Sequence, residues 1–161
     1  MRLSDYSDYT LRVLMCCANQ GERLLTISEI AQSLQVSKNH LMKVVNDLAR
    51  QGLLQTTRGR GGGIRLLPAP EAIRIGDVVR NSETDFRMVE CFDSATDTCT
   101  LTPGCRLKDV LHRALAAYLR ELDAVTLADM APPPGRPSGR PSGARGRAVT
   151  VALPKGRRPA G

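Results

Sequence analysis

The sequence predicts a mainly α-helical fold, a winged helix-turn-helix with a small two-stranded β-wing and a long C-terminal dimerisation helix. Three observations predict it. Two short amphipathic helix patterns are joined by a tight turn, a glycine-rich hairpin pattern follows them, and a long apolar stripe at helical spacing precedes a run of prolines. A helix, a turn, a second helix and a short hairpin are the elements of a winged-helix DNA-binding domain, in the order that such a domain requires.

The first helices are indicated by their ends as well as by their apolar faces. A helix is expected over residues 7–19, and Gly21 follows its last turn. The segment from Thr26 to Glu29 has the capping-box pattern, in which a threonine hydroxyl caps a backbone N–H and a glutamate reaches back. Ser37 is the expected cap of a third helix that ends before Gly52. This third helix buries one face, which consists of Leu41, Val44, Val45 and Leu48.

A hairpin follows the third helix. Strands are expected over residues 53–57 and 64–67, joined by a basic turn with four glycines. Residues 71–80 are expected to form a short helix, followed by a loop. From residue 106 to about 130 one uninterrupted helix is expected, and its apolar stripe is too long for so small a domain to cover. A second copy of the same helix is therefore the expected partner, which gives a homodimer.

These elements divide the chain into four parts. Residues 1–80 form the expected DNA-binding domain, residues 81–105 a cysteine loop, residues 106–131 the dimerisation helix and residues 132–161 a disordered basic tail rich in proline and glycine. The absence of an apolar run long enough to span a bilayer predicts a soluble, cytoplasmic protein that does not interact with membranes. An odd number of cysteines, two of them adjacent at Cys16 and Cys17, does not fit a secreted disulfide framework.

The positive charge is unevenly distributed. The net charge of +7 arises from the tail, because residues 1–131 contain as many basic as acidic residues. Within residues 26–67, however, six basic residues face only two acidic ones, and this local excess lies where DNA would bind. The glycine-rich turn is not expected to bind a nucleotide phosphate, because a strand pattern follows it where such a loop needs a helix.

The expected DNA contacts fall into three groups. Side chains in the first turn of the third helix are placed to contact base edges in the major groove, and they are Lys38, Asn39 and His40. Two basic residues further along that helix, Lys43 and Arg50, are better placed for phosphates. Arg58 and Arg60 lie in the glycine-rich turn and are expected to enter the minor groove.

Three cysteines, Cys91, Cys99 and Cys105, lie within fifteen residues between the DNA-binding pattern and the long helix. Their spacing differs from the short knuckles of structural zinc sites and favours an iron–sulfur cluster, with zinc or a thiol–disulfide redox pair as alternatives. Three thiolates leave one coordination position open, for which the candidates are His112, Glu90, Asp93 or a carboxylate from the first helix. A loop in this position would pass the loss of its ligand on to the DNA-binding domain, which indicates a sensor. Cys16 and Cys17 are expected to be packing residues.

The chain resembles a known family, the iron–sulfur winged-helix regulators of bacteria, and most closely its nitric-oxide-sensitive repressors. The resemblance covers residues 1–131, and its most specific segments are residues 7–12 (SDYTLR), 36–40 (VSKNH), 58–64 (RGRGGGI), 73–80 (IRIGDVVR), 102–108 (TPGCRLK) and 126–129 (TLAD). It implies a transcriptional repressor and not an enzyme. It also implies that the intact cluster supports operator binding and that nitric oxide destroys it, which derepresses genes of nitrosative-stress defence.

The resemblance also implies a set of ligands. Cys91, Cys99 and Cys105 would hold a 4Fe-4S cluster, and Asp8 from the other subunit would be its fourth ligand. The cluster-biogenesis regulators of the same family have a histidine three residues after the last cysteine, where this chain has Lys108, and this difference argues against their 2Fe-2S cluster. The alternatives are a regulator that senses iron–sulfur status or redox poise, with a 2Fe-2S cluster, and a DNA-binding module stabilised by zinc.

Overall fold

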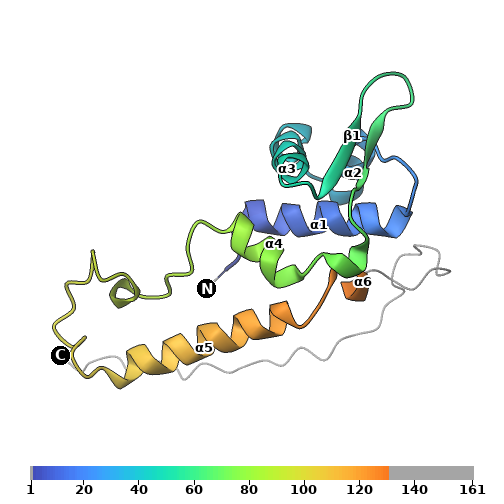
Figure 1. The fold of residues 1–161 in the computed structure, drawn as a ribbon. Coiled ribbons are helices and arrows are strands. Elements are labelled where there is room, and N and C mark those ends of the chain that lie inside the picture. Colours follow the sequence, from blue (N-terminus) through green and yellow to red (C-terminus); the bar gives the residue numbers. More distant parts are fainter. Residues whose placement is uncertain (1, 131–161) are drawn as a thin grey trace, which may run out of the picture.

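The computed structural model describes residues 2–130, and the expected basic tail, residues 132–161, lies outside them. Its elements confirm the fold class, because a mainly helical chain carries one two-stranded antiparallel sheet (Figure 1). In chain order they are α1 (Asp5–Gln20), α2 (Ile27–Leu34), α3 (Lys38–Arg50), β1 (Leu54–Thr57), β2 (Gly63–Leu66), the 3-10 turn η1 (Pro70–Ala72), α4 (Ile75–Ser82), the 3-10 turn η2 (Glu90–Phe92), α5 (Arg106–Asp123) and α6 (Leu127–Met130).

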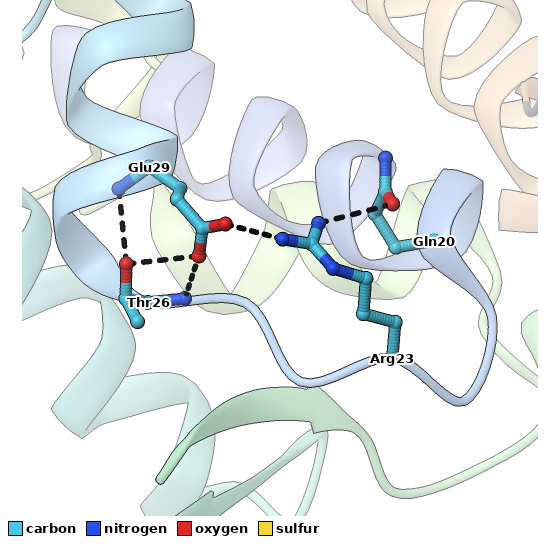
Figure 2. Close-up of polar contacts among 4 residues, drawn as sticks. All are labelled: Gln20, Arg23, Thr26 and Glu29. Atoms are coloured by element: carbon cyan, nitrogen blue, oxygen red, sulfur yellow. Dashed lines mark hydrogen bonds and ion pairs between the residues drawn. The ribbon is translucent and has the colours of Figure 1, made fainter. Parts of the chain in front are cut away.

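The helix-turn-helix forms as its caps predict. The Thr26 hydroxyl accepts a hydrogen bond from the Glu29 backbone N–H at 3.2 Å, and the Glu29 carboxylate accepts one from the Thr26 N–H at 2.7 Å, which completes the capping box of α2 (Figure 2). Figure 2 also shows the Arg23 guanidinium bridging Glu29 and Gln20, so α2 is fixed to the end of α1. The turn to α3 passes through Gln35, which adopts a left-handed conformation with φ of 56°.

The wing is a short hairpin fixed to the helical core. Leu54 pairs with Leu66 and Thr57 with Gly63, and the backbone of Ile64 exchanges two hydrogen bonds with Leu25, at 2.8 and 2.9 Å. The connecting turn needs its glycines, because Gly59 has a φ of 98° that a side chain would strain. The wing therefore has a fixed base and a tip without bulky side chains apart from its two arginines.

One hydrophobic core lies around α1, which contacts α3 on one side and α4 on the other. Its fully buried side chains come from every helix of the first half and also from α6, and the largest are Leu14, Ile30, Leu41, Leu48 and Leu127. Figure 1 shows α3 and the wing on one side of α1 and α5 on the other, beyond α4. None of the helices within residues 2–130 combines the length and the apolar character that a membrane crossing requires.

The C-terminal helix differs from the expected one. The uninterrupted helix over residues 106–130 is divided, because α5 ends at Asp123 and the short α6 begins only at Leu127, after three intervening residues. Between them the backbone forms a bridge with residues 73–75, in which the Ile75 N–H donates to the Val125 carbonyl at 3.1 Å and the Leu127 N–H to the Ile73 carbonyl at 2.8 Å. For the same reason the helix expected over residues 71–80 begins only at Ile75.

Because of this break, residues 124–130 do not extend the expected dimerisation helix but pack against the hydrophobic core. Leu127 is completely buried in the core, and Leu122 and Val125, which lie within the stretch expected to form the dimerisation helix, pack against the same core. The α6 segment thus belongs to the same packed core as α1 to α4. The remaining α5 has no buried residue, and Leu107 and Val110 near its start are 63% and 48% exposed.

Candidate DNA interface and cysteine loop

The surface of α3 opposite the core contains most of the expected DNA contacts. Lys38, Asn39 and His40 are exposed in the first turn, and Ser37 caps that turn by accepting a hydrogen bond from the His40 N–H at 3.4 Å. Lys43 and Arg50 are also exposed, further along the helix. The sequence therefore identified an accessible helix face, which is the arrangement that insertion into a major groove requires.

Two aromatic residues of α1, which the sequence did not single out, contact this helix. The His40 ring stacks on Tyr9 with 6.4 Å between ring centroids, and the Lys43 ammonium lies 5.7 Å from the centre of the Tyr6 ring. The Tyr6 hydroxyl donates to Asp47 at 2.6 Å, and burial together with this hydrogen bond raises the pKa of Tyr6 to about 12. Asp47 also pairs with Arg50. The sequence signal that could have indicated these contacts is the spacing of Tyr6 and Tyr9, three residues apart and therefore on one face of the helix.

The arginines of the wing differ in their surroundings. Arg58 and Arg60 are exposed at the tip. Arg65, in β2, instead donates hydrogen bonds to Gln55 at 2.9 Å and to Glu22 at 2.8 Å, so it stabilises the base of the wing. The tip arginines thus remain the candidates for a DNA groove.

The cysteine loop is organised by hydrogen bonds among its own polar side chains. The Glu90 carboxylate, next to Cys91, accepts the backbone N–H of Thr98 at 2.8 Å and also its hydroxyl. These hydrogen bonds tie the segment of Cys91 to that of Cys99 and hold the pKa of Glu90 below its usual range. Two consecutive turns follow, because the Thr102 N–H donates to the Cys99 carbonyl and the Cys105 N–H to the Thr102 carbonyl. Cys105 then directly precedes α5.

The three thiols have the right chemistry for a cluster. None of the five cysteines, all of which lie in the described part of the chain, forms a disulfide, and Cys91, Cys99 and Cys105 are all at least partly exposed. Thiolates are the ligands that iron–sulfur clusters and zinc share. Within residues 2–130 of one protomer, however, no three histidine, cysteine, aspartate or glutamate side chains converge on a point that could hold a metal ion. Residues 2–130 of one chain therefore supply suitable donor atoms that do not converge in this structure.

Each candidate for a fourth ligand, in the loop, on α5 or on α1, has another contact. Glu90 binds Thr98, and Asp93 pairs with Arg87 at 2.9 Å. The His112 ring lies parallel to Phe92 with a centroid distance of 4.0 Å, which packs the loop against α5. On α1, Asp8 is half-buried at the surface and pairs with Arg12 at 2.9 Å. Asp8 is thus accessible at the surface of the chain.

The two cysteines of α1 behave as expected. Cys17 is buried in the core, and burial raises the pKa of its thiol to about 12. Cys16 is half-buried against the same core, and burial raises the pKa of its thiol as well. Both thiols are therefore protonated at neutral pH, which agrees with their expected role in packing.

Comparison with known proteins gives consistent matches over the described part of the chain. Residues 3–133 match the family described as Rrf2, iron-dependent transcriptional regulator. The HTH-type transcriptional regulators NsrR of Bacillus licheniformis and of Bacillus subtilis are both 51% identical over 131 residues, which cover 81% of this chain and 92% and 90% of the relatives.

Solved structures share the fold. CymR, the global cysteine regulator of B. subtilis, superposes with a TM-score of 0.65 at 28% identity, covering 81% of this chain and 96% of its own. IscR of T. potens gives 0.63 at 25% identity, covering 81% of this chain and 85% of its own. The arrangement of the helix-turn-helix, wing and α5 is thus common to these regulators.

Proposed function

This chain belongs to the Rrf2 family, and on that premise we propose that it is a homodimeric repressor that binds operator DNA while its cysteine loop holds an iron–sulfur cluster and releases that DNA in response to nitric oxide. As a member of this family the protein is a DNA-binding transcriptional regulator and not an enzyme. The cluster, its 4Fe-4S type, the dimer and the signal are the parts of the proposal that go beyond the family.

The observation that carries the proposal is the cysteine loop itself. Cys91, Cys99 and Cys105 are free thiols on turns that are tied together by Glu90 and Thr98 and that lead directly into α5. These three cysteines would hold the cluster, with Asp8 of the second protomer as the fourth ligand. A cluster of this kind supplies iron, to which small diatomic gases such as nitric oxide bind.

The dimer is supported by the surface of α5. This helix has 18 residues and buries none of them, although Leu107 and Val110 are large apolar side chains. Contiguous exposed apolar residues on a helix indicate an interface. Pairing of α5 with its copy would cover them and would place the loop of one protomer near α1 of the other, as a ligand from Asp8 requires.

The contacts between α1 and α3 support the idea that a change at the cysteine loop alters DNA binding. Asp8 lies between Tyr6 and Tyr9, whose side chains contact Lys43 and His40 of α3. A ligand bond to Asp8 would hold this turn of α1, and through the two tyrosines it would hold the start of α3. Loss of that bond would release the same turn and change the position of α3 relative to its copy in the dimer, to which a two-site operator is sensitive.

Native mass spectrometry of protein purified without oxygen tests the proposal. The expected dimer carries one 4Fe-4S cluster per protomer, and nitric oxide changes that mass and releases operator DNA in the same sample. Cys99→Ser should lose both the cluster and specific DNA binding, whereas Cys16→Ser, which changes a packing cysteine outside the loop, should keep them. A zinc mass, with DNA binding unaffected by nitric oxide, would overturn the proposal in favour of a zinc-stabilised module. A two-iron mass unaffected by nitric oxide would favour a sensor of iron–sulfur status or redox poise.

The fourth ligand needs a separate measurement. Asp8→Asn removes the negative charge with little change of shape, and it should alter the absorption spectrum of the cluster and make it easier to lose. Asp5→Asn is the matched control, because Asp5 is a more exposed carboxylate of the same helix that pairs with Arg2. Identical spectra for wild type and Asp8→Asn would exclude Asp8 as a ligand.

A further inference from the structure

The exposed face of α3 contains one large apolar side chain, Met42, that forms no part of the hydrophobic core. Met42 is 49% exposed, whereas its helix neighbours Leu41, Val44 and Val45 are at most 2% exposed. An isolated apolar residue on a surface is common and needs no explanation by itself. The position of Met42 among the polar residues of α3 is what points to a function.

Met42 lies on a narrow uncharged ridge along this helix. At about 100° per residue, Asn39, Met42 and Asn46 fall within about 60° of one another around the helix axis, on the side away from the core. All three are exposed. Residues 39 and 46 are about 10 Å apart along the axis, which corresponds to roughly three base pairs of DNA. The basic residues Lys38 and Lys43 lie at the edges of this ridge.

This pattern matches the chemistry of the major groove. Phosphates at the edges of the groove attract the basic residues, whereas its floor presents the base edges. The C5-methyl group of thymine is the apolar group on that floor, and it favours contact with an apolar side chain. Asparagine, like glutamine, can pair with adenine through two hydrogen bonds, so Asn39 and Asn46 on either side of Met42 suit A·T base pairs.

We propose that Met42 is a specificity-determining residue that contacts the C5-methyl group of a thymine in the major groove. The inference rests on the DNA binding of the proposed function, but it depends neither on the type of cluster nor on the nitric oxide response. Burial of Met42 against the methyl group removes both apolar surfaces from water. At about 0.8 kcal/mol for a buried methyl group, the loss of that group corresponds to a roughly four-fold weaker affinity for each half-site.

The experiment uses DNA in which only this methyl group changes. Preferred duplexes are first selected from random sequences with the anaerobically purified wild-type protein. Each thymine of the selected duplex is then replaced in turn by deoxyuridine, which lacks only the methyl group. The wild type should lose about four-fold in affinity at one thymine per half-site. Met42→Ala should bind the thymine and the uracil duplex equally at that position, and Met42→Leu, which keeps an apolar contact, should restore part of the difference.

Met130→Ala is the matched control, because Met130 is a 37% exposed methionine of α6, an element that lies on the other side of α1 from α3 (Figure 1). This variant should keep the wild-type sensitivity to uracil. The inference is overturned if no uracil replacement weakens the wild type, or if Met42→Ala remains as sensitive as the wild type at every thymine. A wild-type protein that selects no sequence at all would overturn the specific DNA binding as well, so the two failures are distinguishable.

Discussion

Replacing Leu127 by alanine tests whether the end of the described chain belongs to the DNA-binding domain. Leu127 is completely buried in the core, although it lies more than fifty residues beyond the wing. Leu127→Ala removes three carbon atoms, worth about 2.4 kcal/mol at 0.8 kcal/mol for each buried methylene, and leaves a cavity behind. The expected loss of unfolding free energy is therefore about 3 kcal/mol, within the range measured for buried leucines.

Urea unfolding followed by circular dichroism measures this loss at a fixed protomer concentration, because a dimer makes stability concentration-dependent. Leu67→Ala is the matched control, since Leu67 is 59% exposed near the wing and its truncation should cost less than about 0.5 kcal/mol. The reasoning is refuted if Leu127→Ala costs less than about 1 kcal/mol with an unchanged denaturant slope, because α6 would then lie outside the cooperative core.

Three further changes test other features of the structure. Thr10→Val should raise the unfolding free energy by about 1 kcal/mol, because the Thr10 hydroxyl is buried without a hydrogen-bond partner within residues 2–130; a loss would reveal a partner. Burial alone would raise the pKa of Glu83, but hydrogen bonds from the two serines at the start of α1 outweigh it and hold the pKa below its usual range. The stability that ionised Glu83 contributes is therefore present at neutral pH and is lost as the pH falls through the lowered pKa. Glu83→Gln should make the unfolding free energy depend less on pH in the acid range, and an unchanged pH dependence would contradict the contact. Gly76→Ala should lower the melting temperature although alanine favours helices, because its Cβ would lie 1.9 Å from an Asp123 oxygen; a higher temperature would show that Asp123 moves away at no cost.

The sequence predicts those parts of the fold that local chemistry determines. The capping box at Thr26 and Glu29, the cap at Ser37 and the glycine-rich wing each depend on residues only a few positions apart, and each is confirmed. The break after Asp123 was missed because its cause is distant. The backbone of residues 125–127 pairs with that of residues 73–75, and a helical apolar spacing does not reveal such a bridge.

The candidate site shows the same division. The exposed basic face of α3 follows from its apolar spacing, so Lys38 and Lys43 could be identified from the sequence. Their contacts with α1 could not, because Tyr6 and Tyr9 reach α3 only once the two helices are packed together. The link between Glu90 and Thr98 depends on the path of an irregular loop, for which the sequence contains no periodic signal.

The attachment of α5 at one end has a mechanical consequence. Near its C-terminus, Asp123 accepts two hydrogen bonds from Arg80, the longer at 2.6 Å, and α6 anchors the following residues in the core. The other end carries Cys105 about 27 Å away, at 1.5 Å per residue over 18 residues. The helix therefore has one end fixed to the core and the other at the cysteine loop. A displacement of about 5 Å at Cys105 would correspond to a tilt of α5 by about 10° about its fixed end, so a small rearrangement of the loop would change the angle between α5 and the helix-turn-helix.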